Sequence, residues 1–177
     1  MRCAVVLVAL LVGTAAAEER QEVAPARPAT QVQLDLGLAV IAAGIEHAVS
    51  DQLAVQAEAF ITSTYFLDWF GLAPRTDGFG GGVRLTWLEH PRGRGLYGVA
   101  LLRLSGVHTD ASDAFLMTEV GLAAGYAFPL RDRLELRLGV GIVGFHGSGA
   151  EARVGMTGTA NVGAPFVQLD GVLAYRL

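Results

Sequence analysis

The residues with the clearest potential for chemistry are His146 and Ser148, which lie two positions apart in the segment FHGSGAEA. A serine hydroxyl becomes a nucleophile when a histidine removes its proton, and a carboxylate then orients that histidine. Glu151 and Asp170 are the candidates for this third role. The competing interpretation is an ordinary glycine- and serine-rich loop, which we favour because Ser148 lies between two glycines that would hold a nucleophile loosely.

Other reactive groups are few. The only cysteine is Cys3, and the four histidines show no ligand spacing, so we expect neither a metal site nor a cofactor. The segment GFGGG at 78–82 lacks the lysine and the helix of a phosphate-binding loop. The chain has 13 basic and 17 acidic residues, and this balance argues against nucleic acid as a partner.

The N-terminus predicts export. Arg2 precedes an apolar run at 4–12, and three alanines at 15–17 are followed by a polar stretch. This is the pattern of a secretory signal peptide over residues 1–17, because the apolar run is shorter than the roughly 20 residues that a membrane-spanning helix needs. Residues 18–30 are polar, contain proline and predict a flexible lead-in. Residues 31–177 then form one domain.

From residue 31 onward, apolar residues recur at every second position, which indicates strands. The clearest segment is 134–145, and others cover 53–62, 79–88, 95–106, 115–128 and 166–177. Short connections at 48–52, 89–95 and 129–133 alternate with mostly longer ones at 65–78, 107–114 and 146–164. This rhythm is typical of an antiparallel meander with two unlike ends.

The stretch 31–48 leaves two interpretations open. Its alternation slips, since Leu34 and Leu36 occupy even positions whereas Ile41 and Ile45 occupy odd ones. A phase slip marks a turn or a bulge. We divide the stretch near 37–44, which gives about eight strands; the alternative is one bulged strand in a sheet of seven segments.

The chemistry of the two strand faces favours a membrane barrel over a soluble sandwich. One face is Leu, Val, Ile and aromatic residues, and the other is glycine and alanine with charges of both signs. Small residues and opposite charges suit the inside of a narrow barrel. The predicted lumen charges are Asp35, Glu46, Glu58, Arg84, Arg103, Glu119, Glu135, Arg137, Asp170 and Arg176.

Aromatic residues near the strand ends are consistent with girdles at two membrane interfaces. Those near the short turns are Trp87, Tyr126, Phe128 and Tyr175. Those near the long loops are Tyr65, Phe66, Trp69, Phe70, Phe79, Phe115, Phe145 and Phe166.

The last strand, FVQLDGVLAYRL, resembles the terminal signature of bacterial outer-membrane proteins. Its apolar residues at alternate positions are Leu169, Leu173, Tyr175 and Leu177. Leu177 stands where that class usually has phenylalanine. In size and turn rhythm the chain is similar to the small eight-stranded OmpA/OmpX-like barrels, and the segments IEHAVSDQLAVQAEA, HPRGRGLYGVA and AGYAFPLRDRLELRLGVG look like parts of their uncharacterised branch. The resemblance implies an antiparallel up-and-down transmembrane β-barrel that the barrel-assembly machinery inserts.

The predicted function is therefore a monomeric, non-enzymatic barrel of the bacterial outer membrane, exported through the periplasm, with a structural or surface-interaction role. Its partners are membrane lipid and lipopolysaccharide, which scattered loop carboxylates such as Asp77 can approach through divalent cations. Pairs such as Glu119 or Glu135 with Arg103 or Arg137 should plug the lumen. Two alternatives remain: a narrow small-solute pore, and a lipid A acyl hydrolase, since the His-x-Ser segment faintly resembles that of PagL.

Overall fold

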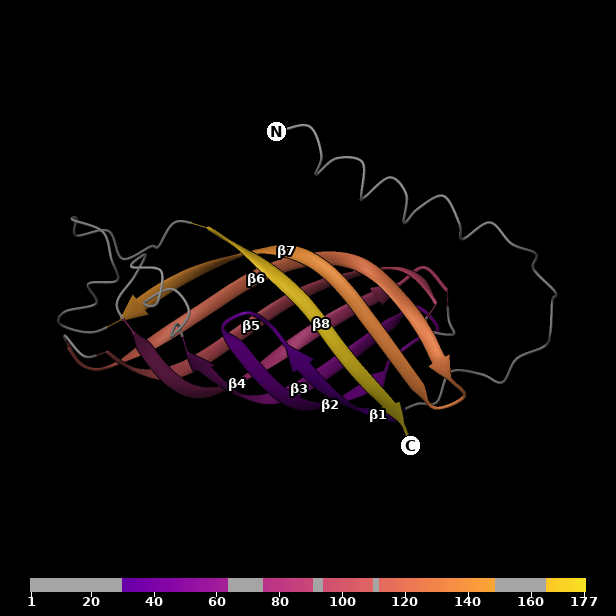
Figure 1. Cartoon of the computed structure of the whole chain (residues 1–177), viewed down its shortest axis with the longest axis horizontal. Helices are drawn as coiled ribbons and strands as arrows, with labels where there is room; N and C mark the ends of the chain where they lie inside the picture. Colours follow the sequence, from indigo (N-terminus) through magenta and orange to yellow (C-terminus); the bar gives the residue numbers. More distant parts are fainter. Residues whose placement is uncertain (1–29, 64–74, 91–93, 110–111, 149–164) are drawn as a thin grey trace.

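The chain forms a closed barrel of eight antiparallel strands (Figure 1). The computed structural model describes residues 30–63, 75–90, 94–109, 112–148 and 165–177. The strands are β1 Thr30–Leu36, β2 Val40–Ala48, β3 Leu53–Ser63, β4 Thr76–Leu88, β5 Gly95–Thr109, β6 Ser112–Arg131, β7 Leu134–Ser148 and β8 Phe166–Arg176. Each strand pairs with the next along the sequence, and β8 pairs with β1. The fold class predicted from the sequence is confirmed.

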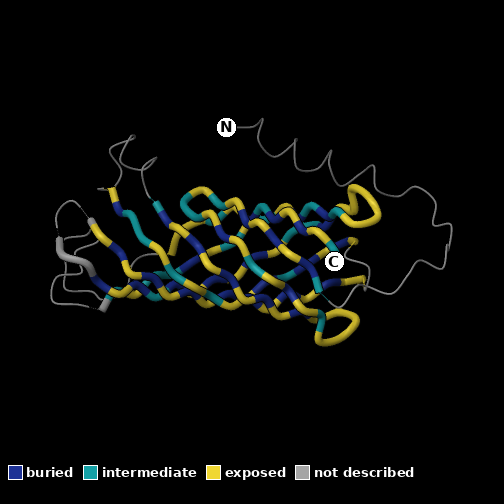
Figure 2. Tube along the Cα trace, turned by 90° about the horizontal axis from the view of Figure 1, so that it is seen from below, coloured by how far each residue is buried: buried dark blue, intermediate teal, exposed yellow. Residues whose placement is uncertain are grey.

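The two-residue period of the sequence explains these strands. Buried and exposed residues alternate along β3 almost without exception, and the same alternation runs around the whole wall (Figure 2). Successive side chains of a strand point to opposite sides of the sheet, so one set enters the lumen and the other faces outward. Closure of the sheet leaves no strand edge along the paired length.

We call the end with the β2–β3, β4–β5 and β6–β7 connections the short-turn end, and the opposite end the long-loop end. Strands reach further toward the long-loop end than the sequence predicted. The segment 107–114 was expected to be a loop, yet β5 continues to Thr109 and β6 begins at Ser112. The polar composition there was misleading, because a strand that extends past the apolar zone tolerates polar residues and bends through a register shift between Val107 and Thr109.

The division of 31–48 into two strands is confirmed, but the connection between them is unlike the other connections at its end. Only Gly37, Leu38 and Ala39 separate β1 from β2. The hairpin turns back about halfway along the barrel (Figure 1), where the amide of Ser63 donates to the carbonyl of Ala39 at 2.8 Å. Consequently β1 pairs with β8 through only five residue pairs, from Gln31–Arg176 to Asp35–Val172.

Thr30 belongs to β1 and not to the lead-in. Its side chain hydrogen-bonds the ring of His47 at 3.1 Å, and its carbonyl accepts from the amide of Leu177 at 3.3 Å. The barrel therefore begins one residue earlier than the sequence predicted.

The outer surface carries an apolar belt, which we define as the outward-facing Val, Leu, Ile, Phe, Trp and Tyr side chains of the strands. Its members on β1, β2 and β3 include Leu34, Ile45 and Val55, and on β6, β7 and β8 Leu122, Val140 and Leu169. Many are about half exposed, for example Ile45 at 57% and Leu122 at 59%. Large apolar side chains thus cover the outside of the described strands, and charged side chains occupy many of the inward positions.

Candidate functional site

The charged interior is the most distinctive site of this barrel. Nine of the ten charged residues that the sequence assigned to the lumen are at most 7% exposed: Asp35, Glu46, Glu58, Arg84, Arg103, Glu119, Glu135, Arg137 and Asp170. The tenth, Arg176, has a side chain that is 16% exposed and lies near the short-turn end. All ten occur on strands, so the rigid wall of the barrel positions them.

The charged residues form two clusters. The lower cluster lies toward the short-turn end and consists of Glu46, Glu135, Arg137 and Arg176. The Arg137 guanidinium donates to both carboxylate oxygens of Glu46, at 2.8 and 3.0 Å, and to Glu135 at 2.6 Å. Arg176 donates to the other oxygen of Glu135 at 2.9 Å, and the side-chain amide of Gln31 donates to Glu46. Two carboxylates and two guanidiniums therefore neutralise one another.

The second group of charged residues, which we call the upper cluster, contains two arginines. The first of them is Arg103, midway along β5. Its guanidinium donates to Glu58 at 2.5 Å, to Asp35 at 2.8 Å and to Glu119 at 3.1 Å. The same guanidinium carbon lies 5.4 Å from the centre of the Phe60 ring, a cation–π geometry. Arg103 is 1% exposed, so these contacts replace its hydration completely.

The second half of the upper cluster is centred on Arg84 of β4. Arg84 donates to Asp35 and, at 2.7 Å, to Asp170, whose second oxygen accepts the Tyr97 hydroxyl proton at 2.6 Å. The upper cluster thus joins four carboxyl groups to two guanidiniums, whereas the lower cluster is balanced. This excess makes the upper cluster depend strongly on each arginine, because a buried unpaired carboxylate is costly.

Most of these ion pairs cross the lumen instead of joining neighbouring strands. The sequence paired Glu119 or Glu135 with Arg103 or Arg137 across neighbouring strands. The structure has Glu119 with Arg103 in this arrangement, whereas Glu135 and Arg137 pair along a single strand, β7. Arg84 of β4 also reaches Asp35 of β1, and Arg137 of β7 reaches Glu46 of β2. Alternation fixes which side of the wall a residue faces, but it does not show which strands oppose each other across a closed barrel.

Three neutral members of the network were not assigned from the sequence. Tyr97, Gln31 and Gln56 occupy inward positions of their strands and bond Asp170, Glu46 and Glu58 respectively. The sequence could have indicated them, because they share a strand face with charged residues. Tyr97, for example, has the same alternation phase as Arg103. Polar residues at inward positions of a barrel therefore belong to the site as much as the charged ones.

An apolar cluster fills the lumen toward the long-loop end. Val107, Phe115 and Met117 are buried there, and Phe145 packs against them. The assignment of Phe115 and Phe145 to an interfacial girdle is wrong, because both occupy inward positions of their strands. Phe166 shares that inward phase and stacks on Phe145 with ring centres 5.7 Å apart, although it remains 45% exposed.

The structure describes five of the other girdle residues. Tyr126 occupies an outward position of β6, and the centre of its ring lies 4.8 Å from that of Phe128. Trp87, Phe128 and Tyr175 face outward near the short-turn end, at 44%, 41% and 45% exposed, and Phe79 faces outward at 75% near the long-loop end. Residues 65, 66, 69 and 70 lie outside the described part of the chain.

The structure separates the members of the possible hydrolase triad. His146 is exposed on the outward side of β7, where it pairs with Thr118. Asp170 is buried in the lumen opposite Gly139, and Arg84 and Tyr97 occupy both of its carboxylate oxygens. Seven residues of strand separate Gly139 from His146, about 23 Å at the usual rise. Asp170 as the third member of such a triad is therefore wrong.

Ser148 is the last residue of β7, and Glu151 lies outside the described residues. Among the residues described, no three His, Cys, Asp or Glu side chains are arranged to hold a metal ion. Within the same ranges, the structure contains no helix of the length and apolarity that crossing a membrane requires.

Comparisons with known proteins identify the fold. Neisserial surface protein A has a similar structure, with a TM-score of 0.52 and 12% identity over 84% of this chain and 94% of that one. A designed transmembrane β-barrel aligns with a TM-score of 0.43 and 12% identity, over 85% of this chain and 98% of that one. No known family profile and no curated protein sequence matches the chain. The structural likeness at this identity supports the small eight-stranded barrel architecture.

Proposed function

We propose that the protein is an integral outer-membrane β-barrel with a structural or surface-interaction role and with a lumen plugged by paired charges. The observation that carries this proposal is the reversed placement of polarity: the apolar belt faces outward, and the charged clusters lie inside a closed wall. A water-soluble protein rarely exposes a continuous apolar surface of this kind. A bilayer makes the same surface favourable.

The limits of the apolar belt support this orientation in a bilayer. Near the long-loop end the outward residues become polar, with a hydrogen bond from Ser63 to Asp77 at 2.5 Å and an ion pair between Asp77 and Arg75 at 2.7 Å. Near the short-turn end the outward aromatic residues Trp87 and Tyr175 fit a membrane interface, where amphipathic rings concentrate.

The lumen supports a plug over a pore. In the upper and lower clusters, Arg84, Arg103 and Arg137 each make two or more ion pairs. The apolar cluster around Phe115 lies beyond them, toward the long-loop end. Eight strands leave a lumen just wide enough for side chains to fill. Solute passage would require several buried ion pairs to separate at once.

The partners that we propose follow from the same surfaces. Membrane lipid and lipopolysaccharide contact the apolar belt and its polar limit, and the monomer needs no other chain to close its sheet. The barrel-assembly machinery recognises the last strand, in which Leu169, Leu173, Tyr175 and Leu177 face outward at 47%, 37%, 45% and 68% exposed. The protein reaches this membrane through the periplasm and acts without a cofactor.

Membrane fractionation and gel mobility test the proposal. The wild-type protein should fractionate with the outer membrane and should migrate differently before and after boiling, because a closed barrel resists detergent until heated. A soluble periplasmic protein with unchanged mobility would overturn it.

Replacing Leu138 with arginine tests the lipid contact of a single position. Leu138 is 50% exposed on the outer face of β7, and arginine at the bilayer midplane of such barrels costs about 2–4 kcal/mol. The free energy of unfolding in lipid vesicles should fall accordingly. The matched control is Val49→Arg in the β2–β3 turn, 58% exposed, which should cost much less. Equal effects at both positions would argue that Leu138 faces water.

A further inference from the structure

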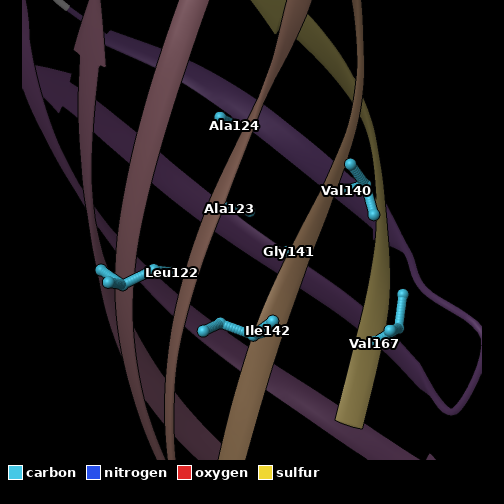
Figure 3. Close-up of a pocket in the computed structure, with 7 residues that line it drawn as sticks. All are labelled: Leu122, Ala123, Ala124, Val140, Gly141, Ile142 and Val167. Atoms are coloured by element: carbon cyan, nitrogen blue, oxygen red, sulfur yellow. The ribbon is translucent and has the colours of Figure 1, made fainter. Parts of the chain in front are cut away.

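A shallow apolar hollow crosses the outer wall over β6, β7 and β8 (Figure 3). Its outward side chains are Leu122, Ala124, Val140, Ile142 and Val167, and Ala123 and Gly141 complete the lining. Leu122 lies on one side of the hollow and Val140 and Val167 on the other, with Ile142 between them (Figure 3). The outward side chain of Ala124 is small and leaves room beside Val140, its partner on β7.

The hollow is followed by polar residues toward the long-loop end. The next outward position of β7 after Ile142 is Gly144, which has no side chain to close the path. The outward position after that is His146, which is exposed and lies opposite Thr118 of β6. An apolar hollow, a glycine gap and a histidine–threonine pair therefore follow one another along one face of the wall.

We propose that this face binds one membrane lipid, with an acyl chain in the hollow and the head-group oxygens at His146 and Thr118. The inference rests on the proposed membrane location. Along its length a lipid has the same order of groups as this face: an apolar chain comes first, and ester and phosphate oxygens follow. The imidazole of His146 and the hydroxyl of Thr118 both donate hydrogen bonds, and such oxygens accept them.

A lipid fits this face better than a second copy of the chain does. The hollow is formed by five outward side chains, whereas a stable protein interface covers about 800 Å² on each partner. The hollow also lies within the apolar belt, the surface that a bilayer would cover with lipid chains.

Lipid titration followed by native mass spectrometry tests the proposal. The delipidated full-length mature protein in detergent is titrated with palmitoyl-oleoyl phosphatidylglycerol, and the fraction with one bound lipid is measured. Wild type should reach one lipid per barrel at the lowest lipid concentration. Ala124→Phe fills the hollow and should weaken binding by about tenfold or more, equivalent to about 1.4 kcal/mol. The matched control is Ala57→Phe on β3, also outward and exposed but on a strand that does not adjoin β6, β7 or β8, which should bind as wild type does.

The head-group contact has its own measurement. Wild type should prefer phosphatidylglycerol over a diacylglycerol with the same chains, and His146→Ala should lose most of that preference while retaining the chain contact. Equal binding by Ala124→Phe, Ala57→Phe and wild type would overturn the proposal. A dimer that only Ala124→Phe disrupts would do the same and identify a second copy as the occupant. A wild-type barrel that fractionates with the membrane but retains no lipid would contradict this inference alone.

Discussion

Replacing Arg103 with methionine is expected to lower the free energy of unfolding by about 3–5 kcal/mol, the range typical of a broken buried ion pair. Arg103 has three carboxylate partners, and its removal leaves Glu58 and Glu119 without the guanidinium that now neutralises them. Asp35 keeps Arg84 as a partner. The upper cluster would then hold four carboxyl groups and one guanidinium in a part of the lumen that excludes bulk water.

The measurement is urea-induced unfolding in lipid vesicles, followed by tryptophan fluorescence. The control is Arg75→Met, which removes an arginine from an exposed pair with Asp77 and should cost no more than about 1 kcal/mol. Methionine keeps much of the length of the arginine stem, so the packing against Phe60 changes less than the charge does.

A charge-balanced variant separates lost charge from lost packing. Arg103→Met combined with Glu58→Gln and Glu119→Gln removes the stranded carboxylates and should recover most of the deficit, as coupled sites in contact do. A deficit that the two glutamines leave unchanged would contradict the electrostatic explanation. A single Arg103→Met variant as stable as wild type would show that the upper cluster is hydrated and weakly coupled.

Deleting Tyr175, Arg176 and Leu177 is expected to abolish most membrane assembly. These residues close the barrel at the short-turn end, where Tyr175 lies opposite Val32 of β1 and Leu134 of β7. The amide of Arg176 also donates to the carbonyl of Arg133 at 2.9 Å. The deletion removes two of the five β1–β8 residue pairs and two outward apolar residues of the last strand.

The measurement is the heat-modifiable, membrane-associated fraction of the expressed protein. Removal of residues 18–29, which leaves Thr30 in place, is the control and should have little effect. Normal yields of heat-modifiable barrel from the C-terminal deletion would contradict the proposed role of the last strand. A comparable loss from both truncations would show that assembly depends on chain length and not on strand closure.

The fold was accessible from the sequence because strand alternation is a local property. The phase slip between Leu36 and Ile41 was sufficient to separate β1 from β2, and the inward phase of Arg103 and Glu119 placed both in the lumen. The end of β5 was not accessible in the same way. His108 and Thr109 extend β5 because neighbouring strands are present to pair with them. The amino-acid composition of a segment does not show whether it has a neighbouring strand.

The sequence showed which charged residues belong to the candidate site, but it did not show which of them are in contact. The pairing of Arg137 with Glu46 and of Arg84 with Asp170 depends on which strands oppose each other across the lumen. That arrangement follows from strand number and stagger. Asp170 illustrates the limit most clearly: sequence reasoning considered it near His146, whereas the wall places the two on opposite faces.

The early turn of the β1–β2 hairpin has a mechanical consequence. A complete ring of paired strands runs around the barrel only where β1 is present, between the short-turn end and Leu36. Beyond that level β8 continues from Gly171 to Phe166 with no paired residue of β1 beside it. The part of the barrel between the short-turn end and Leu36 therefore resists widening. Outward movement of the wall must begin on the long-loop side of Leu36, near Phe166, which is 45% exposed.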